Sequence, residues 1–257
     1  MLKEAFFEQE GIKLFQGNCL DILPTLERES VDLIFADPPY RLSNGGITCK
    51  SGQVAVVDKG EWDKSHGFGE DFQFTYEWIR LCKELLKSNG TIWISGTTHN
   101  IFQVGYALQS LGFHIMNEII WYKPNAPPNL SCRYFAHAHE SVIWAKKCKD
   151  VHHTFNYSLM KKWDDKISPS GNQMRNVWYI PLTSLQEKKY GKHPTQKPLE
   201  LLRRIILSNS NEEDLILDPF VGSGTTGVIA KRFNRKFIGV EIEKDFCDLA
   251  VRRITNA

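Results

Sequence analysis

The sequence predicts an α/β protein with a doubly wound parallel sheet and an inserted basic segment. Short apolar runs, typical of buried strands, alternate with longer amphipathic stretches that are typical of helices. Two of the apolar runs end in an Asp-Pro pair, and proline ends a strand because it cannot donate to the hydrogen-bond ladder. Residues 145–192 carry ten Lys or Arg and four Asp or Glu, although the whole chain has a net charge of only +2.

The expected elements alternate along the chain. Strands are expected where apolar residues run together or alternate, at 12–16, 32–36, 91–95, 118–123, 141–146, 215–217 and 237–240. Helices are expected where apolar residues recur at helical spacing, at 20–27, 75–87, 99–111, 199–207, 225–232 and 244–254. Gly90 and Gly112 are expected to close the second and third helices, and 118–123 is expected to pair with 141–146 as an antiparallel hairpin.

The composition is that of a globular protein, with 42% hydrophobic and 12% aromatic residues. No apolar run approaches the roughly 18 residues of a membrane span, and the first residues do not begin a signal peptide, so we expect a cytoplasmic protein. The six cysteines are scattered without a C-x-x-C pair, which predicts reduced thiols. Neither His137-x-His139 nor His152-His153 has a complete set of ligands at metal spacing, so no metal is expected.

The first candidate site is the stretch FADPPY at 35–40. It follows an apolar strand, so Asp37, Pro38, Pro39 and Tyr40 are expected at the carboxyl end of that strand, where open α/β sheets bind their ligands. The two rigid prolines would fix a carboxylate, a carbonyl group and a ring in one place. The alternative is that the prolines only end the strand and Asp37 caps a turn.

The second candidate site is the stretch LILDPFVGSGTTG at 215–227. Gly222 and Gly224 permit a tight turn and a close backbone approach, and the helix that begins at Thr225 offers unpaired N–H groups. About 20 residues later a second strand ends in Glu241, where a carboxylate can accept ribose hydroxyl groups. Together they predict a nucleotide-type cofactor site.

Three motifs occur in a characteristic order: DPPY at 37–40, HPTQKP at 193–198 and DPFVGSGTT at 218–226. They resemble the amino-methylating DNA methyltransferases of the β arrangement, over nearly the whole chain. More narrowly, FADPPYRLSNGG, KGEWDKS, NLSCRYF and GKHPTQKP resemble the second adenine methyltransferases of DpnII-type restriction systems. The resemblance implies the seven-stranded S-adenosylmethionine-dependent fold with circularly permuted motifs: a catalytic half at 1–123, a target-recognition region at 124–192 and a cofactor-binding half at 193–257.

The implied function is methylation of adenine N6 in DNA, within GATC, as part of a restriction-modification system. Among relatives Asp-Pro-Pro-Tyr usually accompanies adenine methylation, and Ser-Pro-Pro-Tyr accompanies cytosine-N4 methylation. The alternatives are a cytosine-N4 methyltransferase, an orphan regulatory adenine methyltransferase, a protein or RNA amine methyltransferase and a noncatalytic DNA-binding protein.

The chemistry gives each catalytic residue a role. The lone pair of the adenine amine is delocalised, so Asp37 would accept one amine hydrogen and the Pro38 carbonyl the other, which stabilises the positive charge that develops during methyl transfer. Tyr40 would stack on a base extruded from the duplex. No covalent enzyme intermediate is needed.

The resemblance also implies a set of cofactor residues. The adenine-contacting segment would supply Asn18, Cys19 and Asp21; the methionine-side loop would supply Asp218, Phe220, Gly222, Ser223, Gly224, Thr225 and Thr226; Glu241 would take the ribose. The motif at 193–198 would place His193, Thr195 and Lys197 at the methionine end, unless this segment is only a proline-ordered turn before the helix at 199–207.

Two stretches are expected to touch DNA. The basic segment interleaves aromatic residues, which suits phosphate neutralisation and base contact, although it could equally be a solvated surface. Within 124–192, Arg133 and Arg175 are candidates for base or phosphate contacts, and Lys161 and Lys162 for phosphate contacts. Residues 41–70 contain six glycines and are expected to be a lid that orders on DNA, or else a stretch that is disordered without function. Double-stranded DNA is the expected partner, with single-stranded DNA and a homodimer as further expectations.

Overall fold

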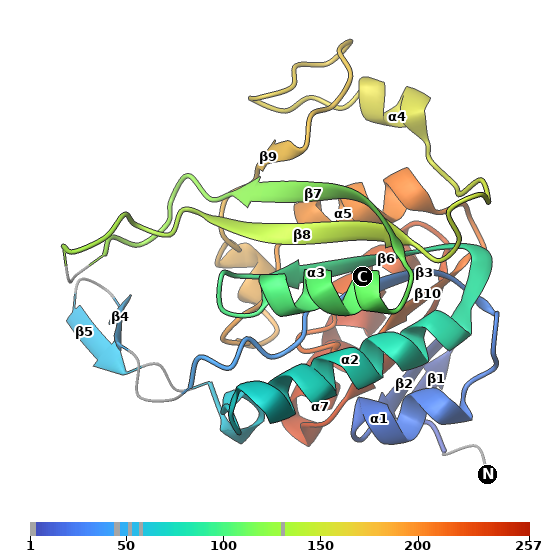
Figure 1. Cartoon of the computed structure of the whole chain (residues 1–257), viewed down its shortest axis with the longest axis horizontal. Coiled ribbons are helices and arrows are strands. Elements are labelled where there is room, and N and C mark those ends of the chain that lie inside the picture. Colours follow the sequence, from blue (N-terminus) through green and yellow to red (C-terminus); the bar gives the residue numbers. More distant parts are fainter. Residues whose placement is uncertain (1–3, 44–46, 51–52, 57–58, 130–131) are drawn as a thin grey trace.

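The structure is a computed structural model, and it describes residues 4–43, 47–50, 53–56, 59–129 and 132–257 (Figure 1). Its main sheet contains β1 (Phe7–Gln9), β2 (Ile12–Gln16), β3 (Val31–Ala36), β6 (Leu86–Gly96), β7 (His114–Tyr122), β8 (His139–Lys146), β9 (Val177–Tyr179), β10 (Leu215–Asp218) and β11 (Lys236–Glu241). The helices are α1 (Cys19–Ile22), α2 (Phe68–Leu85), α3 (Ile101–Ser110), α4 (Tyr157–Lys161), α5 (Leu199–Asn209), α6 (Thr225–Arg232) and α7 (Lys244–Thr255). A separate hairpin pairs β4 (Ile47–Lys50) with β5 (Gln53–Val56).

The main sheet has the strand order β1-β2-β11-β10-β3-β6-β8-β7-β9. Its centre, from β2 to β6, is parallel, while β8 runs antiparallel to both β6 and β7. The expected seven-stranded sheet is therefore corrected to nine strands among the described residues. The two additional strands, β1 and β9, lie at the edges and have three residues each, which is too short for a hydrophobic period to reveal them.

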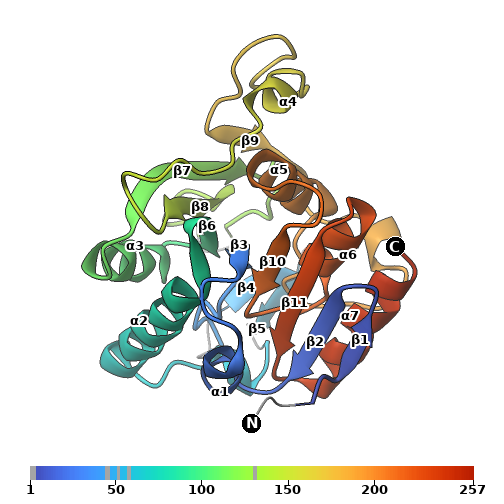
Figure 2. The same ribbon diagram turned by 90° about the vertical axis from the view of Figure 1, so that its right-hand side faces the viewer.

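Helices cover both faces of the sheet, as the doubly wound pattern predicts. Helices α2 and α3 pack on one face, and α5, α6 and α7 pack on the other (Figure 2). Successive side chains of β3 alternate between the two cores: Leu33 and Phe35 face one, and Ile34 and Ala36 face the other. A strand buried on both faces needs the continuous apolar run that the sequence shows there.

Several expected boundaries are corrected. Helix α2 begins at Phe68, seven residues before the expected start, and ends at Leu85. Gly90 therefore does not close a helix; it lies inside β6, at an irregular pairing with β3 where a Cβ atom would come within 3.1 Å of the Val31 carbonyl oxygen. The helix expected at 20–27 is divided into α1 and a 3-10 turn at Leu23–Thr25, because Pro24 cannot continue an α-helix.

Other expectations are confirmed. Helix α6 has the expected bounds, and β7 pairs with β8 in antiparallel fashion, with Glu118 opposite Ile143. The segment between β8 and β9, which carries α4, stands away from the main sheet at the top of Figure 1. It is tied down by a buried ion pair in which the Arg204 guanidinium of α5 lies 2.7 Å from the Asp165 carboxylate.

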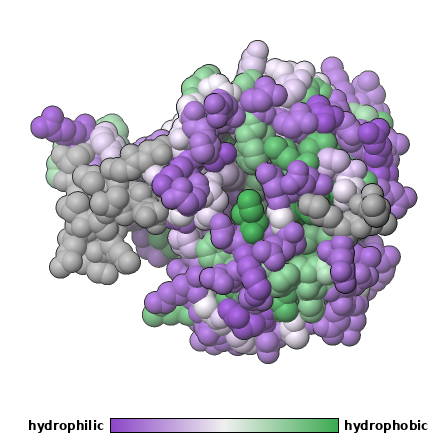
Figure 3. Space-filling model, turned by 90° about the horizontal axis from the view of Figure 1, so that it is seen from below, coloured by the Kyte–Doolittle hydropathy of each residue, from purple (hydrophilic) through white to green (hydrophobic). Residues whose placement is uncertain are grey.

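The surface of the molecule is largely polar in the view from below. Figure 3 shows a hollow near the middle of this face, in which hydrophobic side chains gather while hydrophilic ones surround it. No helix in the described part of the chain is long and apolar enough to cross a membrane.

Candidate active site

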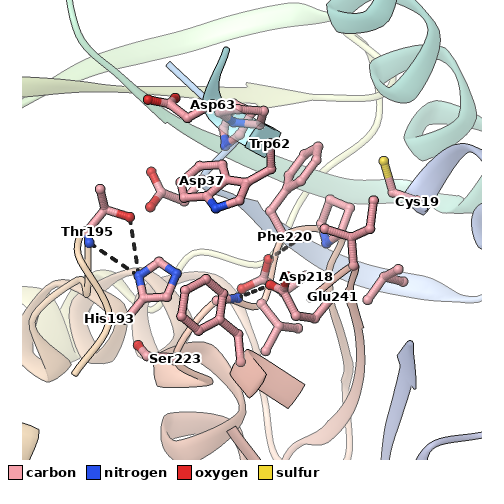
Figure 4. Close-up of a pocket in the computed structure, with 18 of the residues that line it drawn as sticks. Cys19, Asp37, Trp62, Asp63, His193, Thr195, Asp218, Phe220, Ser223 and Glu241 are labelled. Carbon is pink, nitrogen blue, oxygen red and sulfur yellow. Dashed lines mark hydrogen bonds between the residues drawn. The ribbon is translucent and has the colours of Figure 1, made fainter. Parts of the chain in front are cut away.

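The two predicted sites come together at one edge of the sheet. Strands β3 and β10 are parallel neighbours, with Leu33 opposite Ile216, so their carboxyl ends bring Asp37 and Asp218 to the same region. Both aspartates line a cavity of about 310 Å³. Figure 4 shows Asp37 on one side of this cavity, His193 and Ser223 on another, and Cys19 at the far end.

The Asp37 carboxylate is held on both of its oxygens. The Tyr40 hydroxyl donates to Oδ1 at 2.6 Å, and the Lys197 ammonium lies 2.6 Å from Oδ2. Pro38 and Pro39 connect Asp37 to Tyr40 where the chain leaves the sheet, and both prolines line the cavity. Burial, followed by the nearby Asp37 and Glu140 carboxylates, raises the pKa of Tyr40 well above its usual value. The Tyr40 hydroxyl therefore stays protonated and acts as a donor.

Behind Asp37 lies a network that sequence reasoning missed. Glu140 of β8 accepts from Lys197 at 3.5 Å and from the Tyr40 hydroxyl at 3.2 Å, and its other oxygen faces Lys123 at 3.0 Å. Ser95 of β6 lies 2.8 Å from the Tyr40 hydroxyl oxygen. Burial acts to raise the pKa of Glu140, but Lys197 and Lys123 outweigh it and lower that pKa. Burial likewise acts to lower the pKa of Lys197, but Asp37 and Glu140 outweigh it and raise that pKa.

The glycine-rich loop after β10 is held by uncharged donors. The Thr226 hydroxyl donates to Asp218 Oδ2 at 2.5 Å, and the Phe220 backbone N–H donates to Oδ1 at 2.9 Å. The backbone N–H of Gly222 donates to Glu241 at 2.7 Å, which joins the loop to the end of β11. Burial is the main cause that raises the pKa of Asp218 to about 7, and it also raises the pKa of Glu241.

The glycines of this loop have separate local reasons. Gly224 has φ +78°, and a Cβ atom there would lie 2.8 Å from Ala250, so it permits both the left-handed turn and the contact of α6 with α7. Gly222 has φ +52°, and a Cβ atom there would lie 3.1 Å from Nε2 of His193.

His193 is a buried, uncharged imidazole. Burial, followed by the positive charge of Lys197, lowers its pKa to about 3. Its ring packs edge-on against Phe246, with the centroids 4.2 Å apart, and its Nδ1 accepts from the backbone N–H of Thr195 at 3.2 Å. A neutral ring at this place avoids a further positive charge beside the cavity.

Most of the predicted cofactor residues line one cavity. These are Asn18, Cys19, His193, Thr195, Lys197, Asp218, Phe220, Gly222, Ser223, Thr225, Thr226 and Glu241. Asp21 instead lies exposed on α1, and Gly224 is absent from the lining of the cavity. Asn18 caps α1 by accepting from the Leu20 backbone N–H at 3.0 Å, and burial raises the pKa of the Cys19 thiol to about 12.

Part of the predicted lid packs against the cavity. Asp63 is fully buried and accepts from the backbone N–H groups of Arg41 and Leu42, at 2.9 and 3.1 Å. This clamp places Trp62 over His193, with ring centroids 6.3 Å apart and planes at 24°. Residues 44–46, 51–52 and 57–58 of the predicted lid lie outside the described residues, and residues 68–70 belong to α2. That DNA orders the lid stays a prediction.

The predicted DNA contacts lie away from the cavity lining. Arg133 is exposed in the connection between β7 and β8, Lys161 and Lys162 are exposed at the end of α4, and Arg175 is exposed just before β9. Within the described residues, no group of three or more His, Cys, Asp or Glu could hold a metal ion.

The fold and the site together define a class of protein. A doubly wound sheet carries an Asp-Pro-Pro-Tyr turn after β3 beside a glycine-rich loop between β10 and α6, and Glu241 at the end of β11 accepts from that loop. A family model described as DNA methylase, of the N6/N4 type, matches residues 31–252. The chain belongs to this family of DNA methylases.

Curated relatives agree over almost the full length. The chain is 51% identical to the type II methyltransferase M2.DpnII of Streptococcus pneumoniae, over 99% of this chain and 93% of that protein. It is 50% identical to the type II methyltransferase M2.MboI of Moraxella bovis, over 97% of this chain and 90% of that protein. The chain is therefore a DNA methyltransferase related to those of type II restriction-modification systems.

Solved structures show the same fold. The M1.HpyAVI–SAM complex is 27% identical, with a TM-score of 0.68 over 95% of this chain and 98% of that chain. The PvuII DNA methyltransferase, which is cytosine-N4-specific, has a TM-score of 0.76 over 98% of this chain and 89% of that chain. At 20% identity, the PvuII enzyme compares with this chain in fold alone.

Proposed function

We propose that this chain transfers a methyl group from S-adenosylmethionine to N6 of adenine in GATC, as the second methyltransferase of a type II restriction-modification system. The observation that carries the proposal is the placement of Asp37. Its carboxylate is held on both oxygens at the end of a strand, and it lines the same cavity as the glycine-rich loop. The 51% identity to M2.DpnII supports the assignment to that system. We propose a cytoplasmic enzyme because cellular DNA is its substrate.

The cavity fits S-adenosylmethionine by its donor and acceptor groups. Glu241 and Asp218 offer carboxyl oxygens to hydroxyl groups, and Phe220 and Cys19 offer apolar surface. The side-chain oxygen of Gln196, which also lines the cavity, is buried and finds no hydrogen-bond partner among the described residues, so it suits a donor such as an α-ammonium group. When bound, the cofactor supplies an activated methyl group on a sulfonium ion.

The residues of the chain then act on the amine. Asp37 accepts one amine hydrogen and the Pro38 carbonyl accepts the other, so that the nitrogen lone pair turns toward the methyl group. The Asp37 carboxylate stabilises the positive charge that develops on the amine. Holding donor and acceptor in line contributes much of the remaining rate enhancement, and Tyr40 presents a ring for the extruded base. The neutral ring of His193 adds no charge that would repel the sulfonium ion.

We further propose that the motif order is circularly permuted, because the catalytic motif precedes the cofactor loop in the chain. Residues 124–192 form the target-recognition region between 1–123 and 193–257. This agrees with the part between β8 and β9, which stands away from the main sheet and carries Lys161, Lys162 and Arg175, whereas β8 and β9 themselves belong to that sheet (Figure 1). Activity on single-stranded DNA and a homodimeric state complete the proposal.

Product analysis tests the proposed function. The purified chain is incubated with labelled S-adenosylmethionine and with duplexes that contain GATC, duplexes that carry single-base variants of it, and the matching single strands. We expect N6-methyladenine, identified by mass spectrometry of the nucleosides, and only from strands that contain GATC. N4-methylcytosine as the product, or equal labelling of all the sequences, would overturn the adenine or the GATC assignment.

Charge and sequence reading are separable in the proposed DNA contacts. Changing Lys161 and Lys162 to Gln should weaken binding to every duplex and reduce the salt slope by about 1–2, because each phosphate contact releases counterions. Arg133→Ala or Arg175→Ala should cost roughly 1–3 kcal/mol on GATC alone if the arginine reads a base edge. Binding is measured by fluorescence anisotropy over a salt series. The matched control changes the exposed Lys13 and Lys236 to Gln, which should leave the slope unchanged.

A further inference from the structure

Lys197 is a buried cation between two carboxylates. Its side chain is 6% exposed, and its ammonium lies 2.6 Å from Asp37 and 3.5 Å from Glu140. The Tyr40 hydroxyl contacts the same two carboxylates, at 2.6 and 3.2 Å. Three segments that are distant in the sequence therefore meet at one point: the turn after β3, the start of β8 and the turn before α5.

This arrangement raises an electrostatic question. During methyl transfer a positive charge develops on the amine, and a carboxylate stabilises it only if nearby cations do not cancel that carboxylate. An ammonium at 2.6 Å orients Asp37 but offsets its charge, and burial leaves little water to screen it. Lys59, whose ammonium lies 5.6 Å from the centroid of the Tyr40 ring and interacts with the carboxylates of both Asp37 and Glu140, is a second cation at this place. Asp37 alone would be outnumbered by these two cations, whereas Glu140 adds a second carboxylate that balances them.

Glu140 is the second carboxylate beside Lys197, and it does not line the cavity. It therefore acts through Lys197 and Tyr40. Its other oxygen lies 3.0 Å from the ammonium of Lys123, whose side chain is 13% exposed. Lys197 lies against both Asp37 and Glu140, whereas the described ion pairs join Lys123 to Glu140 alone, so Lys197 is the lysine that directly offsets the charge of Asp37.

We propose that Glu140 is a positioning residue for methyl transfer: it fixes Lys197, through which Asp37 is oriented, and it supplies the negative charge that Lys197 would otherwise cancel. Lys197 accordingly belongs to the catalytic centre rather than to the methionine end of the cofactor site. This proposal rests on the proposed function, because it assumes an amine acceptor at Asp37.

Glu140→Gln tests the proposal, because it keeps the shape and removes the charge. We expect kcat to fall at least tenfold, while the Kd for S-adenosylmethionine and the Kd for DNA stay within about twofold. Glu140→Asp, which restores the charge, should recover part of kcat. A merely structural residue would lower the melting temperature and weaken binding along with kcat, and Glu140→Asp would not selectively recover kcat.

Two further variants keep the test decisive. Glu118→Gln makes the same change on β7, where Glu118 accepts from Ser141 Oγ at 2.7 Å, and should leave kcat unchanged. If Glu140→Gln alone fails to fold because Lys123 is left unpaired, the double variant Glu140→Gln with Lys123→Gln removes both charges and should show the same loss of kcat.

The outcomes separate this proposal from the proposed function. Product analysis of the wild-type enzyme reports on the methylated base and its sequence, whereas the variants are compared with the wild type on whichever DNA it methylates. Wild-type kcat in Glu140→Gln or in the double variant, or a parallel loss of kcat and of both binding affinities, would overturn the role of Glu140.

Discussion

Asp37 and Asp218 occupy equivalent places and have different partners. Asp37 directly follows β3 and Asp218 is the last residue of β10, each is followed by a proline, and the two strands are parallel neighbours. Asp37 faces the Lys197 ammonium and the Tyr40 hydroxyl. Among the described residues, Asp218 accepts only from uncharged donors, the Thr226 hydroxyl and a backbone N–H. The two aspartates lie at the carboxyl ends of neighbouring strands, and their different partners give them different roles.

The different partners of the two aspartates explain how one site can serve both the amine of the DNA base and the cofactor. Asp37 is held as a carboxylate by Lys197 and Tyr40, which suits contact with a substrate amine on which positive charge develops. The uncharged donors around Asp218 suit a residue that organises the glycine-rich loop. Burial raises the pKa of the Asp218 carboxyl to about 7, so a large share of this carboxyl is protonated near neutral pH. Catalysis and cofactor binding should therefore be separable by substitution.

The largest expected effect comes from Asp37→Asn. This change keeps the size of the side chain, but it removes the charge that stabilises the developing cation and replaces one of the two acceptor oxygens with a donor, so kcat should fall by about 10²–10³-fold. The Kd for S-adenosylmethionine should stay within about threefold. Methyl transfer is measured with labelled cofactor, and cofactor binding by calorimetric titration. A variant that loses both properties in parallel would break the comparison.

A smaller effect in the opposite property is expected from Asp218→Ala. Loss of the acceptor for Thr226 and Phe220 loosens the loop, which should weaken cofactor binding by about 10–100-fold. At saturating cofactor, kcat should change by less than about threefold. The same calorimetric and kinetic measurements apply, and a kcat loss as large as that of Asp37→Asn would show that the two aspartates share one task.

The two aspartates were predictable because their signals are local. An apolar run followed by Asp-Pro favours a strand end, and the closely spaced Gly222 and Gly224 indicate a tight loop after Asp218. The partners of Asp37 were not predictable from composition or spacing. Lys197 lies 160 residues away, and Glu140 reaches the site through the antiparallel pairing of β6 with β8. The resemblance placed Lys197 in a site motif but gave it to the cofactor.

The same contrast runs through the fold. Buried strands such as β3 and β10 were predicted because both of their faces are apolar. Helix α6 was predicted because the glycine-rich turn before Thr225 and the helical spacing of the apolar residues indicate the same start. The edge strands β1 and β9 depend on three residues each and on their neighbours. Gly90 has the local appearance of a helix end, but tertiary pairing with β3 makes it part of β6. Long-range pairing therefore decided the elements that local patterns did not.

The smallest effect concerns stability. The pKa of Asp218 is about 7 in the folded protein and 3.8 in an unfolded chain, so the folded state binds the extra proton. This contribution is fully present below pH 3.8 and is lost as the pH rises through about 7. Between pH 5.5 and 8, the wild type should lose about 1–2 kcal/mol relative to Asp218→Asn, which has no proton to release.

Comparing the two proteins removes the contribution of His193, which has the opposite sign. The pKa of His193 is lowered from 6.5 to about 3, so its contribution is present above pH 6.5 and is lost as the pH falls toward 3. Both proteins keep His193, so it cancels in the difference between their free energies of unfolding. Urea unfolding at several pH values measures that difference. If it stays constant from pH 5.5 to 8, Asp218 titrates as an ordinary aspartate, and its uncharged partners do not distinguish it from Asp37.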